Sequence, residues 1–319
     1  MIEEKNKVQN STLYLVATPI GNLADISERA IKVLTEADFI AAEDTRNSVR
    51  LLSALGIKKE LVSYHEHNKK ASGERLVARL LAGESCALIT DAGMPAISDP
   101  GEDIVRLCAD AGITVSVIPG ACAAVSALSV SGLGTSRFAF EGFLSANKNE
   151  RKKQLDKVKY EDRTIIFYEA PHKLRQTLGD MTEVFGGERK ISLCRELTKL
   201  NEEIMRTTLQ CAIAYYEANE PRGEYVLVVE GFSGEVISDD QKQLLSLSPE
   251  EHVEKYVNDG MARMDAIKRA AKDRGMSKSE LYKILMRAGC SYRRSGRYYP
   301  RRRYSAGGSG NIGQNGRNR

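Results

Sequence analysis

The chain contains no long uninterrupted apolar run, although 42% of its 319 residues are hydrophobic and 28% are charged. The longest mostly apolar stretch, residues 113–130, is broken by Pro119-Gly120 and by several hydroxyl-bearing residues, so it does not qualify as a membrane-spanning helix. The first residues, MIEEKNK, lack the apolar core of a secretory signal. With a balanced composition that excludes wholesale disorder, these absences predict a globular, cytoplasmic protein.

Several common site motifs are also missing. The cysteines are scattered and form no CxxC pair, which argues against a zinc site or a redox motif, and we expect no metal. Reduced, mostly buried thiols are the expected state of Cys86, Cys108, Cys122, Cys194, Cys211 and Cys290. The sequence has neither GxGxxG nor a P-loop, so no standard dinucleotide or NTP phosphate site is indicated.

Acidic residues are absent from the C-terminal segment, residues 290–319, which carries eight arginines. The net charge of the whole chain is +4, so the preceding residues sum to −4. That body offers no broad positive field, and a nucleic-acid partner would depend on local patches and on the tail. The tail is rich in Arg, Tyr and Gly, and we expect it to be disordered.

Short apolar runs alternate with helical patterns from Thr12 onward, which predicts an α/β layer structure with a largely parallel sheet. Strands are expected at residues 13–17, 39–42, 86–90, 113–118, 138–144, 163–169, 189–196 and 224–230. The acid pair Asp25 and Glu28 resembles a capping box before a helix that ends near residue 36. Further helices are expected at residues 101–111, 121–130, 149–160, 171–185 and 209–218. After a flexible N-terminus, residues 1–11, we therefore expect two consecutive α/β domains, residues 12–130 and 135–232, with a cleft between them.

Residues 245–289 have a purely helical pattern. Ser248 and Ser277 each precede an acid by three residues, as at a capped helix start, and Gly260, Gly275 and Gly289 mark the expected helix ends. Three short helices with a Gly-Met-Ser turn are compatible with a helix-turn-helix reader of nucleic acid. A small packing or dimerising bundle is equally compatible.

Three loops marked by glycine and proline follow expected strands: Thr18-Pro-Ile-Gly-Asn22, residues 91–101, and Pro119-Gly-Ala-Cys122. In a parallel α/β sheet, ligands bind beyond the carboxyl ends of the strands. Each loop alone is weak evidence because Gly and Pro punctuate any turn, but their joint placement predicts one shared small-molecule pocket. Polar groups follow two further runs, in Ala42-Glu-Asp-Thr-Arg46 and in Tyr64-His-Glu-His-Asn68. They are either functional or a solvated helix start and ordinary loop residues.

The motifs LYLVATPIGNLADIS, AAEDTR, SYHEHN, LITDAGMPAISDPG, VIPGACAAVSAL, FEGFL, YEAPHKL, RELTK and GEYVLVVEG occur in one order across about 220 residues. Together they resemble the bacterial small-subunit ribosomal RNA (cytidine-2′-O)-methyltransferases of the tetrapyrrole methylase superfamily. The resemblance implies two α/β domains of tetrapyrrole-methylase type, S-adenosylmethionine as cofactor, and 2′-O-methylation of a cytidine in the decoding region of 16S rRNA. It also implies 16S rRNA in the small ribosomal subunit as partner, and a homodimer.

The same resemblance carries a cofactor pocket onto this chain. It maps to Pro19, Asp91, Gly93, Met94, Pro95, Ile97, Gly120, Ala121, Cys122, Tyr168, Ala170 and Glu224. The residue types fit the chemistry, because a sulfonium donor is already activated and the protein has to hold its methyl group in line with the acceptor. Met94 and Ala121-Cys122 depart from the usual family residues, as do Asn201 and Thr207, without an expected change of reaction.

A ribose hydroxyl attacks well only as its proton leaves, so a carboxylate or imidazole is expected to accept that proton. Four candidates stay open on sequence grounds: Glu43, Asp44, Asp99 and His65. We expect RNA contacts at Arg46, His67 and Asn68, with Arg46 as a phosphate clamp. In the tail, Arg293, Arg294 and Arg301 lie among tyrosines, as in segments that bind single-stranded RNA.

Two other functions are compatible with these features. One is a methylase of tetrapyrroles or other small molecules on the same scaffold, although AEDTR, YHEHN and the helical region argue against it. The other is a ribosome-assembly factor that binds RNA and whose methylation is incidental.

Overall fold

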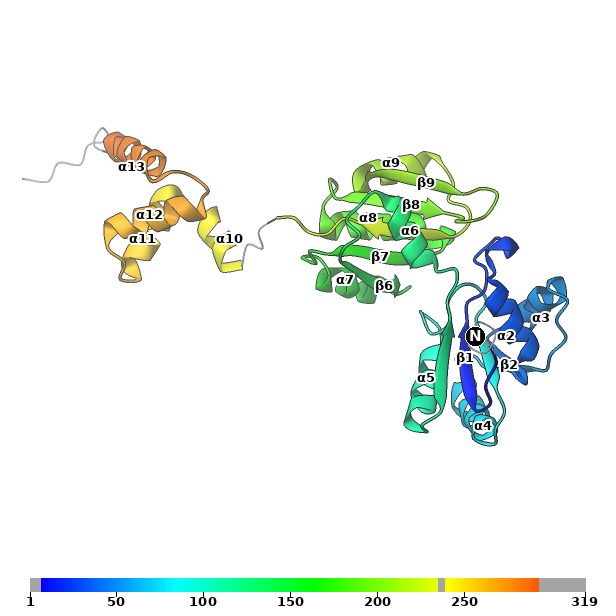
Figure 1. Cartoon of the computed structure of the whole chain (residues 1–319). Coiled ribbons are helices and arrows are strands. Elements are labelled where there is room, and N and C mark those ends of the chain that lie inside the picture. Colours follow the sequence, from blue (N-terminus) through cyan, green and yellow to red (C-terminus); the bar gives the residue numbers. More distant parts are fainter. Residues whose placement is uncertain (1–6, 235–238, 293–319) are drawn as a thin grey trace, which may run out of the picture. The chain divides into compact units, whose positions relative to one another are not determined.

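The computed structural model describes residues 7–234 and 239–292, and the chain divides into two compact units, residues 1–234 and 235–319. The first unit holds two five-stranded sheets with interleaved helices, and the second holds helices (Figure 1). The predicted α/β class, with a helical C-terminal region, is thereby confirmed. No helix within the described ranges is long and apolar enough to cross a membrane.

The first sheet, in residues 12–118, is entirely parallel with the strand order β3-β2-β4-β1-β5. Its strands are β1 (Thr12–Val16), β2 (Phe39–Ala42), β3 (Leu61–Ser63), β4 (Cys86–Ile89) and β5 (Thr114–Ile118). The helices between them are α2 (Glu28–Glu36), α3 (Thr45–Ala54), α4 (Lys69–Leu81) and α5 (Gly101–Asp110), and η1 (Leu23–Asp25) is a short 3₁₀ turn. The central strands read FIAA and CALI and are wholly buried, as expected of a parallel sheet covered on both faces.

The strand period of two distributes these side chains between two cores. On β2, Ile40 and Ala42 join one apolar cluster with helix α2, whereas Phe39 and Ala41 join the other with α4 and α5. Because all five strands of the first sheet are parallel, their carboxyl ends lie at one edge of the sheet, where the predicted loops begin.

The second sheet, in residues 138–229, is mixed, with the order β6-β7-β10-β8-β9. Its strands are β6 (Phe138–Phe143), β7 (Thr164–Glu169), β8 (Lys190–Arg195), β9 (Glu203–Thr208) and β10 (Tyr225–Val229). Only β6 and β7 pair in parallel. One face is covered by α7 (Lys148–Lys157), α8 (Pro171–Phe185) and α9 (Leu209–Ala218), and the other by α6 (Ala123–Ser131).

Helix α6 therefore joins the two halves. It follows the last strand of the first sheet, yet Ala124, Ala127 and Leu128 pack on Ile166 and Val228 of the second. Helix α6, which follows the loop at residues 119–122, thus forms part of the core of the second sheet.

A buried ion pair ties α7 to α8 beneath the second sheet. The guanidinium of Arg151, only 2% exposed, donates from Nε to a carboxylate oxygen of Asp180 at 2.7 Å. It also donates to the carbonyls of Ser145 and Ala146 at 2.9 and 3.2 Å. Because these contacts satisfy a charge that has left water, losing either partner would be costly.

The second unit contains α10 (Asp239–Ser246), α11 (Pro249–Asn258), α12 (Arg263–Asp273) and α13 (Lys278–Tyr292). The predicted capping boxes form at Ser248 and at Ser277, whose hydroxyl accepts from the Glu280 amide at 3.3 Å. Val253, Ile267 and Leu281 lie in its apolar core. Gly289 was expected to end the last helix, but α13 continues past it.

Candidate active site

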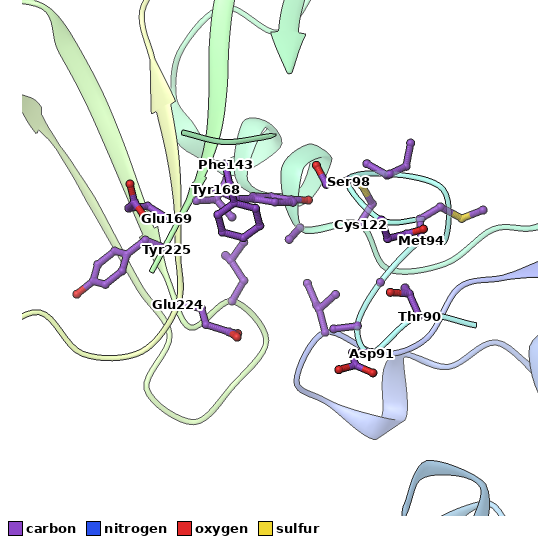
Figure 2. A pocket seen from close by; sticks show the side chains of 18 of the residues that line it. Thr90, Asp91, Met94, Ser98, Cys122, Phe143, Tyr168, Glu169, Glu224 and Tyr225 are labelled. Atoms are coloured by element: carbon purple, nitrogen blue, oxygen red, sulfur yellow. The ribbon is translucent and has the colours of Figure 1, made fainter. Parts of the chain in front are cut away.

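A cavity of about 380 Å³ lies among loops from both sheets of the first unit. Its wall comprises loops after β1, β2, β4 and β5 on one side and the ends of β6, β7, β8 and β10 on the other (Figure 2). That volume falls within the range typical of small-molecule sites. The predicted cleft is therefore present, and it is lined mainly by apolar atoms with a few polar groups.

The three glycine- and proline-marked loops converge beside this cavity. Thr18 and Gly93 exchange backbone hydrogen bonds of 2.9 and 3.1 Å, and the Ala17 amide donates to the Ile118 carbonyl at 3.2 Å. A Cβ added to Gly120 would lie 2.8 Å from the Cβ of Ala17, so the first and third loops touch at a distance that only glycine permits.

The second loop is held by its own carboxylate. One oxygen of Asp99 accepts hydrogen bonds from the amides of Ala96 and Gly101, at 2.9 and 2.7 Å. Ala96 and Ser98 have φ values of 66° and 65°, a region that non-glycine residues adopt at a cost. Asp99 thus stabilises an unfavourable loop conformation at the edge of the cavity.

The second-sheet side of the cavity is anchored by Tyr168. Its hydroxyl accepts a hydrogen bond of 3.2 Å from the Ala124 amide at the start of α6, and burial raises its pKa to about 12. On the same side of the cavity, the ammonium of Lys199 contacts both Glu196 and Glu224 at 2.8 Å. Lys199 also packs against Gly21 of the first loop, where there is no room for a side chain.

Glu43 is a cavity carboxylate whose surroundings raise its pKa. It follows β2, lines the cavity and accepts a 2.9 Å hydrogen bond from the Thr90 hydroxyl. Partial burial raises the pKa of Glu43; the Thr90 bond opposes this shift, and the nearby charges of Asp91, Asp99 and Asp44 add to it. A carboxylate with a raised pKa is a better proton acceptor than an ordinary one.

Asp44 points elsewhere. It is the N-cap of α3, where it accepts from the Arg46 amide at 2.8 Å, and it forms a two-point ion pair with the Arg46 guanidinium. These bonds lower the pKa of Asp44 to about 2. The Arg46 side chain is 87% exposed, so a solvent-facing cation stands next to the cavity residue Glu43.

The YHEHN segment builds a turn. The side-chain oxygen Oδ1 of Asn68 accepts a hydrogen bond from the His65 backbone amide at 2.8 Å, and the side-chain nitrogen Nδ2 of Asn68 donates to the Ser63 backbone carbonyl at 3.1 Å. His65 and His67 stack edge to face at 5.9 Å, and neither lines the cavity. Within the described ranges no three His, Cys, Asp or Glu side chains gather as metal ligands would.

The structure brings ten of the predicted site residues into the lining of one cavity. These are Glu43, Asp91, Gly93, Met94, Ile97, Asp99, Cys122, Tyr168, Ala170 and Glu224. Adjacent to it, but outside the lining, lie Pro19, Pro95, Gly120, Ala121, Asp44 and Arg46. Arg293, Arg294 and Arg301 lie outside the described residues, as do the rest of the tail and Cys290's side chain.

Sequence reasoning did not assign several lining residues, among them Thr90, Phe143, Glu196 and Lys199. Phe143 lies in the FEGFL motif and the last two in RELTK, so the motifs held a signal. Which residues these side chains face across the cavity could not be predicted, because that depends on how the second sheet folds.

Three comparisons place this architecture among known proteins. A family model for tetrapyrrole (corrin/porphyrin) methylases matches residues 12–212. Two solved structures, a cobalt precorrin-4 methyltransferase and a diphthine synthase, align with a TM-score of 0.53 each, at 15% and 16% identity. They cover 69% of this chain and 95% and 90% of their own, and at that identity the likeness is one of fold.

Closer relatives carry one shared name, ribosomal RNA small subunit methyltransferase I. The protein of Halalkalibacterium halodurans is 50% identical over 273 residues, covering 86% of this chain and 94% of its own. Those of Bacillus subtilis and Escherichia coli O157:H7 are 47% and 43% identical, over 85% and 86% of this chain and 92% and 94% of theirs. Matches of that length exceed residues 1–234 and so extend into the helical unit.

Proposed function

We propose that this chain, which belongs to the ribosomal RNA small subunit methyltransferase I family, transfers a methyl group from S-adenosylmethionine to the ribose 2′-hydroxyl of a cytidine in the decoding region of 16S rRNA. The relatives' shared name supports a small-subunit ribosomal RNA as the acceptor. One structural observation carries the chemical part: a partly buried carboxylate, Glu43, lies in the wall of a cavity built from converging glycine loops.

The cavity residues fit the cofactor. S-adenosylmethionine supplies a methyl group that is already activated, so the protein has to bind and orient rather than activate it. Gly93 and Gly120 let the loops around the cavity approach one another closely, because a Cβ on Gly93 would lie 3.3 Å from Ile20 and one on Gly120 would lie 2.8 Å from Ala17. Met94, Ile97 and Tyr168 supply apolar wall. Asp91, whose carboxylate accepts from the Asn47 side chain at 3.0 Å, offers an acceptor for a hydroxyl or amino group.

Glu43 is the best supported proton acceptor among the four candidates. Asp44 is committed to a helix cap and to Arg46, and its lowered pKa makes it a weak base. Asp99 is used by the loop that it holds, and His65 lies outside the cavity lining. The ribose oxygen would bond to the methyl carbon as the bond from that carbon to the sulfonium sulfur breaks, which leaves S-adenosylhomocysteine. The hydroxyl proton would pass to the Glu43 carboxylate.

We assign the contact with the RNA backbone to Arg46. Its guanidinium is largely exposed, and it uses two of its N–H groups on Asp44, which leaves donors in the planar fork that suits phosphate. Asn68 has a structural role in its turn, so we assign RNA contact in this region to Arg46 first, with His67 secondary.

The proposal is tested by offering methyl-labelled S-adenosylmethionine with three acceptors: assembled small subunits, protein-free 16S rRNA and a tetrapyrrole. Label in either RNA arm supports the proposal, and the two arms separate subunit from free RNA as substrate. Label in the tetrapyrrole alone would contradict it. RNA binding without transfer would instead favour an assembly factor.

A further inference from the structure

Phe143 presents an unusually exposed ring at the cavity. Its side chain lines the cavity wall, and the residue is 57% exposed, whereas the next residue, Leu144, is 5% exposed and packs in the core. Some wall residues are deeply buried, such as Cys194 at 1% and Glu169 at 3%, whereas Ile97 on the facing loop is 44% exposed, as is usual near an opening. This difference in exposure places Phe143 at the mouth of the cavity, where an acceptor has to enter.

The backbone directs this ring outward. The pairing of β6 with β7 shifts register between Phe140 and Gly142, which is a β-bulge, and bulges commonly re-aim a side chain beside a functional site. Gly142 has a φ of 64°, and a Cβ there would meet the Ser98 hydroxyl oxygen at 2.9 Å. The β-bulge therefore directs the Phe143 ring, and Gly142 of this bulge lies against Ser98 in the loop on the opposite side of the cavity.

The ring is also supported from one side. Phe143 meets Tyr168 edge to face, with centroids 5.4 Å apart, and Tyr168 contacts Phe140 at 5.0 Å in the same way. The hydrogen bond to the Ala124 amide fixes Tyr168 in turn. Figure 2 shows Phe143 and Tyr168 together, facing the two loops that carry Ser98 and Cys122. A rigid aromatic pair with an open outer surface is a stacking platform.

We propose that Phe143 stacks on an unpaired nucleobase of the RNA and so positions the acceptor nucleotide at the cavity. This inference rests on the proposed function, because it requires an RNA acceptor. Stacking on aromatic rings is how proteins hold splayed-out bases, and it tolerates any base because each has a π face. Phe143 would thus contribute affinity and placement, and the acceptor would have to be unstacked from its neighbours.

The chain contains no tryptophan, so Phe143→Trp introduces a single fluorescent reporter at the platform. Adding an unpaired RNA oligonucleotide of the acceptor region should quench this fluorescence, whereas S-adenosylmethionine alone should leave it nearly unchanged. A duplex of the same sequence should quench it far less. Quenching by the cofactor alone, or equal quenching by the duplex, would overturn the assignment.

Kinetics with assembled subunits separate stacking from simple apolar packing. Base stacking is worth about 1–3 kcal/mol per base, so Phe143→Leu should raise the KM for RNA by about tenfold, at about 1.4 kcal/mol per factor of ten. Phe143→Tyr, which keeps an aromatic ring, should have a KM for RNA close to that of the wild type. The affinity for S-adenosylmethionine should not change in either variant. Phe138→Leu is the matched control, because Phe138 is 40% exposed on the same strand but does not line the cavity.

An unchanged KM in Phe143→Leu, or a loss of cofactor affinity in its place, would overturn the inference while leaving the proposed function intact. If the wild-type protein methylates no RNA, the proposed function fails and the inference with it. Thermal unfolding of each variant identifies any loss that is due to misfolding, and the fluorescence experiment does not depend on the leucine variant.

Discussion

The Thr90 hydroxyl donates a hydrogen bond of 2.9 Å to the Glu43 carboxylate. The two residues follow β4 and β2, neighbouring strands of the parallel sheet, so their contact is a direct result of the strand order. The bond orients a carboxylate whose pKa is raised by burial and partly restrains that rise. Glu43 is therefore both poised as a base and fixed in direction.

Glu43→Gln should reduce the turnover number by about 10²–10⁴-fold, the usual contribution of a positioned acid or base. The amide keeps the shape and can still accept from Thr90, but it cannot take up a proton. Titration calorimetry should show unchanged affinity for S-adenosylmethionine. Turnover close to that of wild type would show that another group accepts the proton.

The same substitution should affect stability in the opposite direction from activity. Because burial raises the folded-state pKa of Glu43, its favourable contribution is present below the unfolded-state pKa and is lost as pH rises through the folded-state value. Glu43→Gln should thus gain in thermal midpoint relative to wild type as pH rises across that window. A relative loss at neutral pH would contradict the desolvation assigned to Glu43.

Thr90→Val should move the acidic limb of the turnover profile. The Thr90 bond lowers the pKa of Glu43, so removing it should raise that pKa further, and activity should then be lost at a higher pH as the solution is acidified. The profile of turnover against pH measures this directly. A limb that stays in place would mean that Glu43 does not control it.

Arg46→Ala should weaken RNA binding and reduce its salt dependence. Removing one phosphate contact is expected to lower the slope of log affinity against log salt by about 1. Arg137→Ala is the matched control, since Arg137 also forms an exposed ion pair, with Asp162, at 68% exposure. Equal effects of the two variants would indicate a general charge effect rather than a clamp.

Gly93→Ala should weaken cofactor binding by about tenfold or more. Gly93 has a φ of 86°, and its Cβ would lie 3.3 Å from Ile20 while the residue pairs with Thr18; a left-handed alanine costs about 1–2 kcal/mol. Gly83 is the matched control, because it precedes strand β4, which Gly93 follows. It has a φ of 102° and no atom near its Cβ position. Calorimetry on Gly83→Ala should show normal affinity, which separates backbone strain at the pocket from strain elsewhere.

Asp180→Ala should destabilise the protein by about 3–5 kcal/mol, because it leaves the buried Arg151 charge without its partner. Glu183, on the same helix, forms an exposed pair with Lys152, and its removal should change stability little. Denaturant unfolding measures the free energy of unfolding of both variants, and hydrogen exchange shows whether helices α7 and α8 remain intact. A small loss in Asp180→Ala would mean that water reaches Arg151.

The first sheet was predictable because its central strands are continuous apolar runs bounded by turn residues. Strand β2 was predicted with its observed bounds, as were helices α8 and α9, and the predicted end of α2 near residue 36 is the observed one. The N-cap of α2 is Ser27 rather than Asp25. Strand β9 was missed since its residues, EIMRTT, are only half-buried and alternate weakly. Strand β3 has three half-buried residues, and the buried faces of α3 and α4 include Ser48, Ser72 and Gly73, which are not apolar signals. The sequence analysis did not predict these three elements.

The candidate site divides in the same way. Loops such as residues 91–101 could be identified because glycine and proline mark them, and they do converge. The distinct roles of Glu43 and Asp44 could not be derived, as they are adjacent in the sequence and differ only in direction and burial. Phe143 is directed to the cavity by a bulge, which depends on pairing with β7 rather than on local residues.

The central claim is that the chain methylates a cytidine ribose in small-subunit ribosomal RNA. The most direct test digests RNA to nucleosides after reaction of small subunits with methyl-labelled S-adenosylmethionine and identifies the labelled nucleoside by mass spectrometry. The account predicts label in 2′-O-methylcytidine, and its loss with Glu43→Gln. Label on a base, on a protein, or on no component of the subunit would contradict it.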